Sequence, residues 1–460
     1  MARFLLMLCV LLIAGCGGSA GGKLNLNGNS SNDSQSLPSN NFSIIENYNQ
    51  ALSLKYPNTF TGTTCEVTDE VGVTIANACT CSVGACQVEF NPATAGSASF
   101  NYSISDNGAN NYEAKGNLTV KAIVPFQSVW RVGNVSYGDG DLTVTLPLLS
   151  GREYDFTVDW GDGNTDTITS HDDVDKNHTY ASAGDYTISI SGLVEAWYFA
   201  NTGDKDKIIA VTELGTVGWR EFWQAFRGCT NLTTFEGGDL SNVTTISSMF
   251  SDSPNVTPNT SGWNTQNIKH MSEAFLNAAS ANPDTSNWDT SSLTNLQSAF
   301  DGATSANPDV SNWDTSRVTT IYSTFANSTI NPDVSKWDTS NVTIMGTAFY
   351  QNTAANPDVS NWDTSKVQSF YAMFYGATSA NPDMSGWDFS SILTFIQSVD
   401  NMFVGNTSLS TENYNNLLIG LDATGISNLN LHGGSATCSG AGCTAKANLQ
   451  GRSWTITDGV

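Results

Sequence analysis

The residues of this 460-residue sequence that are best suited to chemistry are nine cysteines and many regularly spaced aspartates. Cysteine can carry a lipid, form a disulfide or bind zinc, and carboxylates can bind Ca²⁺. The four histidines are widely separated, which argues against a His-based metal centre: His171, His178, His270 and His432. There is no GxSxG, HExxH or Walker motif, and no Ser/His/Asp set that can be placed. We therefore predict no catalytic residues, no metal site and no enzymatic activity.

The first cysteines belong to an export signal. Arg3 precedes an apolar run at residues 4–13, which is too short to span a bilayer permanently. The run ends in LIAGC, which resembles a lipobox and predicts a signal peptide at residues 1–15 with a lipid on Cys16. An ordinary signal peptide with an incidental cysteine is the alternative. Gly17 implies outer-membrane sorting in lipoproteins of Gram-negative type, and residues 16–41 are predicted to form a flexible tether.

Six further cysteines form two groups: Cys65, Cys79, Cys81 and Cys86 in the first, and Cys438 and Cys443 near the C-terminus. An exported chain lies where disulfides persist. A C-x4-C spacing filled with small residues favours Cys81–Cys86 and Cys438–Cys443. Cys65–Cys79 then follows by exclusion, although four cysteines permit three connectivities and zinc is an alternative. Cys229 is left over and is predicted to be a buried free thiol.

The charge of the chain limits its partners. It has 18 basic and 43 acidic residues, a net charge of −25. Nucleic acid and an anionic membrane surface would both be repelled. Basic proteins, neutral glycans and partners bridged by cations remain, so we expect no nucleic-acid partner and a membrane contact only through the lipid.

Two β-domains are predicted before residue 202. Residues 42–124 contain alternating segments at 98–104 and 116–122, and residues 90–120 resemble immunoglobulin-like or cadherin-like modules. Residues 125–201 contain WGDG at 160–163 and HTY at 178–180, in the order found in PKD (polycystic-kidney-disease) domains, so the resemblance implies a second β-sandwich. Its acidic cluster is expected to form solvated turns, with Ca²⁺ binding as the alternative: Asp139, Asp141, Asp172, Asp173 and Asp175.

The dominant signal is a repeat of about 25 residues. Tryptophans recur at 263, 288, 313, 337, 362 and 387. After each WDTS-like segment, apolar residues fall at i, i+3, i+6 and i+7, which predicts one face of a short helix. The Pro-Asp-Val segment predicts a strand. We therefore expect a leucine-rich-repeat-like α/β solenoid at 202–405, with an irregular aromatic lid at Trp219, Phe222 and Trp223 and a C-terminal cap at 406–460.

The unit NPDVSNWDTSKV…MF resembles the BspA-like leucine-rich-repeat surface proteins, which also occur as mycoplasma surface lipoproteins. The resemblance covers residues 195–460. Members of the family are exposed at the cell surface and some bind host proteins or other cells, so the resemblance implies a surface-exposed binding protein. The strand carries Pro-Asp-Val rather than a leucine-rich line, so the family's ligand mode cannot be transferred.

Stacked repeats would align two rows of aspartates, at 289, 314, 338, 363 and 388 and at 284, 309, 333, 358 and 383. Aligned like charges must be offset by turn N–H groups or by Ca²⁺. Variable positions of the repeat carry tyrosines, which we take as ligand-binding candidates: Tyr322, Tyr350, Tyr371 and Tyr375. The alternative is that their rings lie flat and cover the core, in which case more than half of each ring would be buried.

Taken together, these features predict a lipid-anchored protein of the outer membrane and cell surface that binds a protein or glycan on another cell or in the envelope. The two β-modules would form a stalk and the repeats a head. The alternative is a structural coat protein without a specific ligand.

Overall fold

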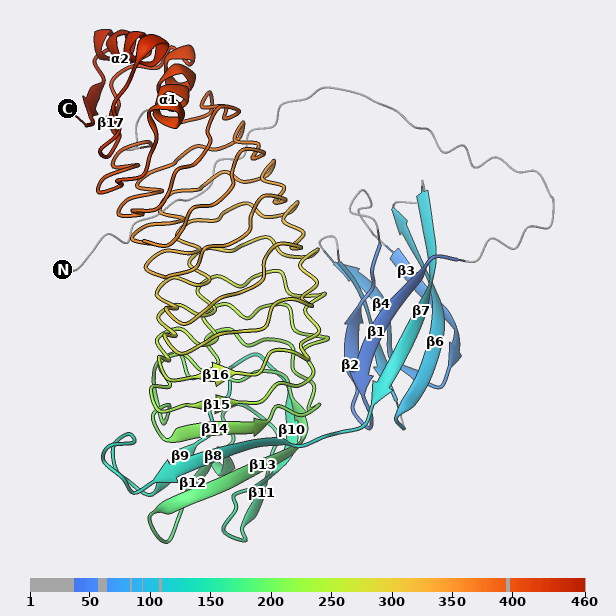
Figure 1. Ribbon diagram of the computed structural model, residues 1–460. Coiled ribbons are helices and arrows are strands. Elements are labelled where there is room, and N and C mark those ends of the chain that lie inside the picture. The colour runs from blue at the N-terminus through green and yellow to red at the C-terminus, as the bar shows by residue number, and fades with distance from the viewer. Residues whose placement is uncertain are drawn as a thin grey trace, which may run out of the picture.

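The computed structural model describes residues 37–56, 64–82, 85–92, 94–106, 110–393 and 398–459 (Figure 1). The predicted signal peptide, Cys16 and most of the tether lie outside these residues. The described chain comprises an N-terminal β-module, a second β-module, a tall stack of coils and a small C-terminal cap (Figure 1).

The N-terminal module consists of two sheets that share one core. The first has the order β1-β7-β6-β3 and the second β2-β5-β4. The strands are β1 (Ser39–Ile45), β2 (Gln50–Ser53), β3 (Thr64–Val71), β4 (Thr74–Ser82), β5 (Ala85–Asn91), β6 (Gly96–Asp106) and β7 (Asn110–Lys121). Alternate residues of β6 are buried, as the sequence pattern requires, and Phe100 and Ile104 meet Phe90 of β5 in the core.

The second module is built on a sheet with the order β11-β10-β13-β8-β14-β15-β16, beside a small β12-β9 pair. Its strands are β8 (Phe126–Val132), β9 (Thr143–Thr145), β10 (Tyr154–Asp159), β11 (Thr165–Ile168), β12 (Asn177–Thr179) and β13 (Gly184–Val194), with a 3₁₀ turn η1 (Val174–Lys176). The WGDG and HTY segments meet: the His178 ring stacks on Trp160 at 4.8 Å, and the Tyr180 hydroxyl donates to the Trp160 carbonyl.

The sheet of the second module continues into the repeats. β14 (Ile208–Glu213) pairs antiparallel with β8, and it pairs parallel with β15 (Thr234–Phe235), which pairs parallel with β16 (Thr257–Pro258). The sheet therefore crosses the predicted boundary between residues 201 and 202, and the second module closes the lower end of the stack (Figure 1).

The repeats form coils that stack with their equivalent residues in register. Isolated parallel bridges join Thr245, His270, Asn295, Thr320, Ile344 and Ser369. Inside the stack, successive repeat phenylalanines from Phe226 to Phe403 lie 5.2–6.0 Å apart, and successive tryptophans from Trp263 to Trp387 lie 5.7–6.4 Å apart. These two aromatic columns are the core of the stack.

The predicted fold class, two β-sandwiches followed by a leucine-rich-repeat-like α/β solenoid, is wrong. The described chain is mainly β-strand in several small sheets, and α-helix occurs among the described residues only in the C-terminal cap. The main sheet of the second module runs on into the coils instead of closing as a sandwich.

The expected helix in each repeat is replaced by two successive turns. Ala299 N–H donates to the Leu296 carbonyl and Ala303 N–H to the Phe300 carbonyl, three residues back. The intervening N–H groups of residues 296, 298, 300 and 302 donate to carbonyls of the next coil. Ser298 and Gly302 have φ values of 51° and 73°, which an α-helix does not allow. Apolar residues three or four apart face inward in both arrangements, so the spacing alone did not distinguish turns from a helix.

The upper end of the stack is closed by α1 (Thr411–Ala423), α2 (Gly440–Gly451) and the parallel pair β17 (Asn430–His432) and β18 (Thr455–Thr457). Ser410 caps α1 by accepting a hydrogen bond from the Asn413 N–H. Four residues of α1 itself are buried: Tyr414, Leu417, Leu418 and Leu421. No helix in the described ranges is long and apolar enough to cross a membrane.

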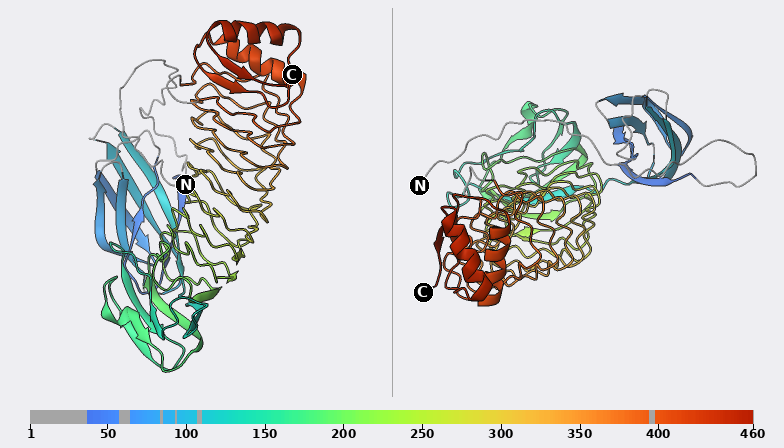
Figure 2. Two further views of the ribbon diagram at one scale, coloured as in Figure 1. Left: turned by 90° about the vertical axis from the view of Figure 1, so that its left-hand side faces the viewer. Right: turned by 90° about the horizontal axis from the view of Figure 1, so that it is seen from above.

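The N-terminal module lies alongside the lower coils (Figure 1 and Figure 2). Lys121 at the end of β7 pairs with Asp239 at 2.5 Å, and the Asn242 amide donates to the Ser43 carbonyl at 2.7 Å. The Arg220 guanidinium donates to the Ala51 carbonyl at 2.8 Å. The expected stalk and head are therefore folded side by side.

Candidate ligand-binding surface

The bridges between coils create one regular outer surface, which we call the ladder face. It consists of each bridge residue and the residue two positions later: Thr245, Ser247, His270, Ser272, Asn295, Gln297, Thr320, Tyr322, Ile344, Gly346, Ser369 and Tyr371. The residue between each pair is buried, as in a β-strand with one face in the core, for example Leu296 and Ile321. None of the twelve residues is Asp, Glu, Lys or Arg, in a chain with a net charge of −25.

Large side chains are exposed along this face. Tyr322 is 37% exposed and Ile344 is 40% exposed. The same register continues downward: the Thr244 N–H donates to the Arg220 carbonyl and the Phe222 N–H donates to the Thr245 carbonyl, and a bridge joins Glu221 to Ala196. Trp223, one coil below the twelve residues, therefore stands in the row of Tyr322, and it is 41% exposed. Trp223 and Tyr322 are the two aromatic residues that the described chain exposes most openly. The row of the ladder face therefore carries both.

Glycine at position 346 shapes the surface around Tyr322. The ring of Tyr322 lies 3.5 Å from the point that a Cβ on Gly346 would occupy, and the Tyr371 carbonyl lies 3.3 Å from the same point. The ring of Tyr322 thus leans over the neighbouring coil, toward the coil that carries Tyr371. One face of the ring is supported and the residue remains partly open to solvent.

The four predicted tyrosines divide into two pairs. Tyr322 and Tyr371 share the row described above, two coils apart. Tyr350 and Tyr375 follow the core residues Phe349 and Phe374 and stack on each other at 4.9 Å with an interplanar angle of 23°. More than half of each of the four side chains is covered, which favours the alternative that these rings lie against the coil surface.

Sequence reasoning missed Trp223. Trp219 and Phe222 of the expected aromatic lid are buried, but the sheet of the second module closes this end of the stack instead. Trp223 faces outward, and its ring lies 5.2 Å from that of Tyr198. The signal was present in the numbering, because Trp223 comes two residues after Glu221 as Tyr322 comes two residues after Thr320. Alignment of the irregular first unit with the regular units would have found it.

The two rows of aspartates serve the turns. Asp314 Oδ1 accepts hydrogen bonds from the N–H of Ser316 at 3.0 Å and from its hydroxyl at 2.6 Å. The serine N–H two residues later makes the same bond in every unit, to Asp284, Asp289, Asp309, Asp333, Asp338, Asp358, Asp363, Asp383 and Asp388. The serine hydrogen bonds hold the pKa of Asp314 below its usual value. Turn groups therefore offset the aligned charges, which was the first of the two explanations.

The acidic cluster of the second module surrounds a lysine. The Lys207 ammonium lies 2.9 Å from Asp139, 2.6 Å from Asp141 and 2.8 Å from Asp204, and only 1% of its side chain is exposed. The other predicted aspartates form local turns instead: Asp173 accepts hydrogen bonds from the Thr169 and Asp175 N–H groups. An ammonium thus occupies the position at which the carboxylates would meet a cation.

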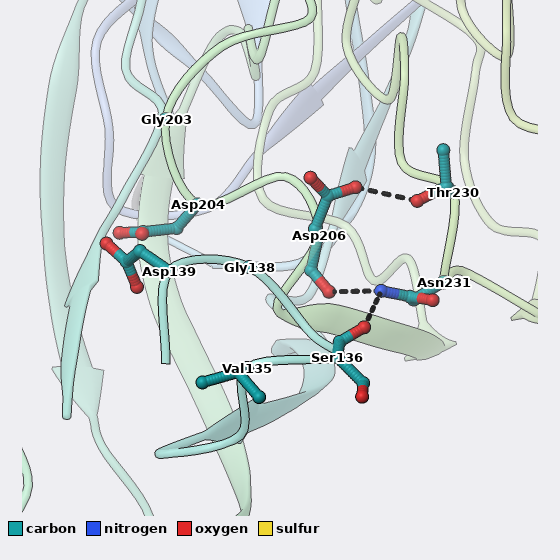
Figure 3. A pocket seen from close by; sticks show the side chains of 9 residues that line it. All are labelled: Val135, Ser136, Gly138, Asp139, Gly203, Asp204, Asp206, Thr230 and Asn231. Carbon is teal, nitrogen blue, oxygen red and sulfur yellow. Dashed lines mark hydrogen bonds between the residues drawn. The ribbon is translucent and has the colours of Figure 1, made fainter. Parts of the chain in front are cut away.

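An open cleft of about 390 Å³ lies beside this lysine (Figure 3). It is lined by Val135, Ser136, Gly138, Asp139, Gly203, Asp204, Asp206, Thr230 and Asn231. Asp206 accepts a hydrogen bond from the Thr230 hydroxyl at 2.7 Å and pairs with Lys205, and its carbonyl accepts from the Asn231 amide. These polar groups tie two loops together.

The described residues form three disulfides: Cys81–Cys86 and Cys438–Cys443, which the spacing favoured, and Cys65–Cys79, which was predicted by exclusion. Cys229 is a buried thiol, and burial raises its pKa well above the ordinary value. Among the described residues, the one trio of potential metal ligands with donor atoms within 4.8 Å of one another is Cys65, Cys81 and Cys86. All three are in disulfides, so the zinc alternative has no free ligands there.

Comparison with known proteins gives one family. Residues 220–331 and 294–416 match the model of a family described as "Mycoplasma protein of unknown function, DUF285". No curated protein and no solved structure matches the chain. The coil stack, which carries the ladder face, is therefore similar to a mycoplasma family whose description assigns no function.

Proposed function

We propose that this protein is a lipid-anchored cell-surface protein that binds a protein or glycan ligand through the ladder face. The observation that carries the proposal is the exposure of Trp223 and Tyr322 in one row, with Ile344 exposed in the neighbouring row of bridge residues. The twelve residues of the ladder face carry no charge, and in the coil of Trp223 the charges of Arg220 and Glu221 are paired with Glu195 and Arg152. Exposed aromatic groups that cluster on one face are typical of interaction sites. We propose a binding role rather than an enzymatic one, because the polar groups of the cleft beside Lys207 are engaged in the contacts that tie its loops together.

Export and surface location are part of the same proposal. Three disulfides are typical of proteins that fold in an oxidising compartment. The lipid on Cys16 would attach the chain to the outer membrane through the tether. A Cys16→Ser variant should leave the membrane fraction and lose labelling with radioactive palmitate. A variant that stays in the membrane fraction and is still labelled would contradict the anchor assignment.

The alternative, a coat protein assembled from its repeats, is less well supported by the geometry. Coils could extend from copy to copy only if an end of the stack were open. The lower end is closed by the sheet that contains β8 and β14, and the upper end by α1 and α2 (Figure 1). Continuous stacking of copies would require one of these caps to detach.

The test is a saturation binding measurement with the full chain on intact partner cells. We expect saturable binding that the double variant Trp223→Ala/Tyr322→Ala weakens, while its melting temperature stays unchanged because both side chains are partly exposed. The matched control is Tyr350→Ala/Tyr375→Ala, which removes two aromatic rings from another row. Absence of saturable binding, or equal loss in both double variants, would contradict a site on the ladder face.

A further inference from the structure

We infer that the ligand of the ladder face is an uncharged polysaccharide whose chain lies along the stacking direction of the coils. The inference rests on the proposed function and names its ligand class. It is carried by three properties of the ladder face: its lack of charge, the spacing of its aromatic rings, and the polar side chains between them.

The lack of charge selects against ionic ligands. The twelve residues of the ladder face include no Lys or Arg to bind sulfate or uronate groups, and Lys269 is the one base in the row that borders it, among Thr244, Thr294, Thr319, Thr343 and Gln368. The overall charge of −25 would repel an anionic glycan. The twelve residues also include no carboxylate. The acidic groups at the edges of the face are already engaged: Glu273 accepts a hydrogen bond from the Ser248 hydroxyl, and Glu221, in the coil of Trp223, pairs with Arg152 at 2.7 Å. A neutral ligand meets neither penalty.

The aromatic rings form a line along the stack. Trp223 lies four coils below Tyr322, and Tyr371 lies two coils above it. Neighbouring parallel strands are about 4.8 Å apart, so these intervals correspond to roughly 19 Å and roughly 10 Å. A pyranose ring has an apolar C–H face that packs against a flat aromatic ring, and the shorter interval is comparable with the length of a disaccharide. A polysaccharide chain can therefore place sugars that are two residues apart on Tyr322 and Tyr371.

The surface between the rings suits a ligand rich in hydroxyl groups. The coils between Trp223 and Tyr322 present the half-buried side chains of Ser272, Asn295 and Gln297. The Ser272 hydroxyl lies 3.0 Å from that of the buried Ser247, to which it hydrogen-bonds. Hydroxyl and amide groups both donate and accept hydrogen bonds, as sugar hydroxyls do. The Asn295 Oδ1 accepts a hydrogen bond from the Gln297 N–H at 2.8 Å, which fixes the orientation of its amide.

The experiment is affinity electrophoresis, which measures how far soluble polysaccharides in the gel slow the migration of the full chain. The neutral probes are mannan, laminarin, xyloglucan and hydroxyethylcellulose, and the anionic probes are heparin and polygalacturonate. We expect retardation by at least one neutral probe and by neither anionic probe. Tyr322→Ala should weaken the affinity about tenfold, whereas Tyr322→Phe, which keeps the ring, should stay within about twofold. Tyr350→Ala/Tyr375→Ala should behave as the unchanged chain.

Binding to intact cells separates this inference from the proposed function. Periodate treatment of the cells, which oxidises sugar diols, should abolish binding, and protease treatment should not. Binding that is sensitive to Trp223→Ala/Tyr322→Ala but resists periodate and is lost with protease would overturn the polysaccharide and leave the ladder face as a protein site. Retardation only by the anionic probes would likewise overturn the inference. If Trp223→Ala/Tyr322→Ala binds cells as well as the unchanged chain does, the proposed function of the ladder face is itself overturned.

Discussion

Lys207 is a charged side chain in a position almost without solvent, and its surroundings explain how the charge is tolerated. Burial acts to lower the pKa of Lys207, but hydrogen bonds from its ammonium to Asp141, Asp204 and Asp139 raise it above the ordinary value. The Thr143 carbonyl accepts a further hydrogen bond at 2.9 Å. The lysine thereby joins the segment around residues 139–143 to the segment around residues 204–207, where the second module passes into the coils.

Replacing this lysine should destabilise the module. In Lys207→Met the carboxylates lose their partner, but Asp139 and Asp141 are about half exposed and can be hydrated, so the loss of unfolding free energy should be about 2 to 3 kcal/mol rather than the larger value of a fully buried pair. Urea unfolding measures it. The control is Lys336→Met, an exposed lysine for which no measurable change is expected. Equal stability of the two variants would contradict a structural role for the cluster.

The aspartates of the turns predict a dependence of stability on acid. Their hydrogen bonds from serine hydroxyl and N–H groups lower the pKa of Asp284, Asp309, Asp314, Asp333 and Asp363 below the ordinary 3.8. A carboxyl group with a lowered folded pKa stabilises the fold above its unfolded value, and this contribution is lost as the pH falls through the folded value. We therefore expect the unfolding free energy to decrease as the pH drops below 3.8.

Urea unfolding at about pH 5 and about pH 3 checks this expectation. The comparison variant is Ser311→Ala/Ser335→Ala, which removes the hydroxyl donors to Asp309 and Asp333 at 2.7 and 2.6 Å. Its loss of stability between the two pH values should be smaller than that of the unchanged chain, because without the hydroxyl donors the pKa of each of the two carboxyl groups rises toward its ordinary value, while the backbone N–H bonds remain. An identical loss in both proteins would show that the turn hydrogen bonds do not control the acid response.

At the scale of the element, each coil is a chain of turns held by its neighbours. Alternate N–H groups close turns within the coil and the others donate to the next coil, so no single coil satisfies its own backbone. The left-handed residues recur at the same two places of each unit, as at Ser323 and Asn327 after Ser298 and Gly302. The aromatic columns fill the interior at every level.

Gly302 distinguishes this arrangement from the helix that the spacing suggested. Its φ is +73°, and an added Cβ would lie 2.6 Å from the Asn277 Oδ1 atom of the preceding coil. Gly302→Ala should therefore cost about 1 to 2 kcal/mol of unfolding free energy. In a helix interior the same change would instead stabilise by roughly 0.5–1 kcal/mol. Thermal or urea unfolding shows whether the change lowers or raises the free energy of unfolding.

The control for this prediction is Gly262→Ala. Gly262 does not have a left-handed φ, and an added Cβ would meet no atom within 4 Å. We expect it to be neutral or slightly stabilising, because alanine lowers the entropy of the unfolded chain. A stabilising effect at both positions would contradict the turn geometry of the coil.

The sequence predicted the repeat, its register and the residues that face inward, but it did not predict the backbone conformation of each unit, which is a pair of turns and not a helix. Trp313, one of the recurring tryptophans, is buried, and so is Phe325, which stands at i+7 of the apolar pattern of its unit. The turns were missed because Ser298 and Ser323 are not residues that demand a positive φ, and their conformation is set by hydrogen bonds to the adjacent coil. The binding candidates were identified by residue type, but the bridge register that separates Tyr322 from Tyr350 is a property of the stacked coils.

At the scale of the whole molecule, the N-terminal module and the stack are held side by side by polar contacts. The linker between β7 and β8 is short, and Thr216 fixes it by donating a hydrogen bond to the Ala122 carbonyl and accepting one from the Val124 N–H. Beyond the linker, the ion pair of Lys121 with Asp239 and the hydrogen bond from Asn242 are contacts between the module and the stack. The module should therefore separate when these contacts are removed.

The variant Lys121→Glu/Asn242→Ala tests this docking. It replaces the ion pair with a repulsion and deletes one hydrogen bond, which together shift the docking equilibrium by about 2 kcal/mol, or roughly thirtyfold. Small-angle X-ray scattering should then give a larger radius of gyration, with an unchanged melting transition for the stack, whose aromatic columns are untouched.

The matched control is Lys115→Glu, which makes the same charge change at an exposed position of the same strand β7 and should leave the radius of gyration unaltered. An unchanged radius in the double variant would mean that the linker and the remaining contacts of Arg220 are sufficient to hold the module, and that the side-by-side arrangement is not controlled by the contacts of Lys121 and Asn242.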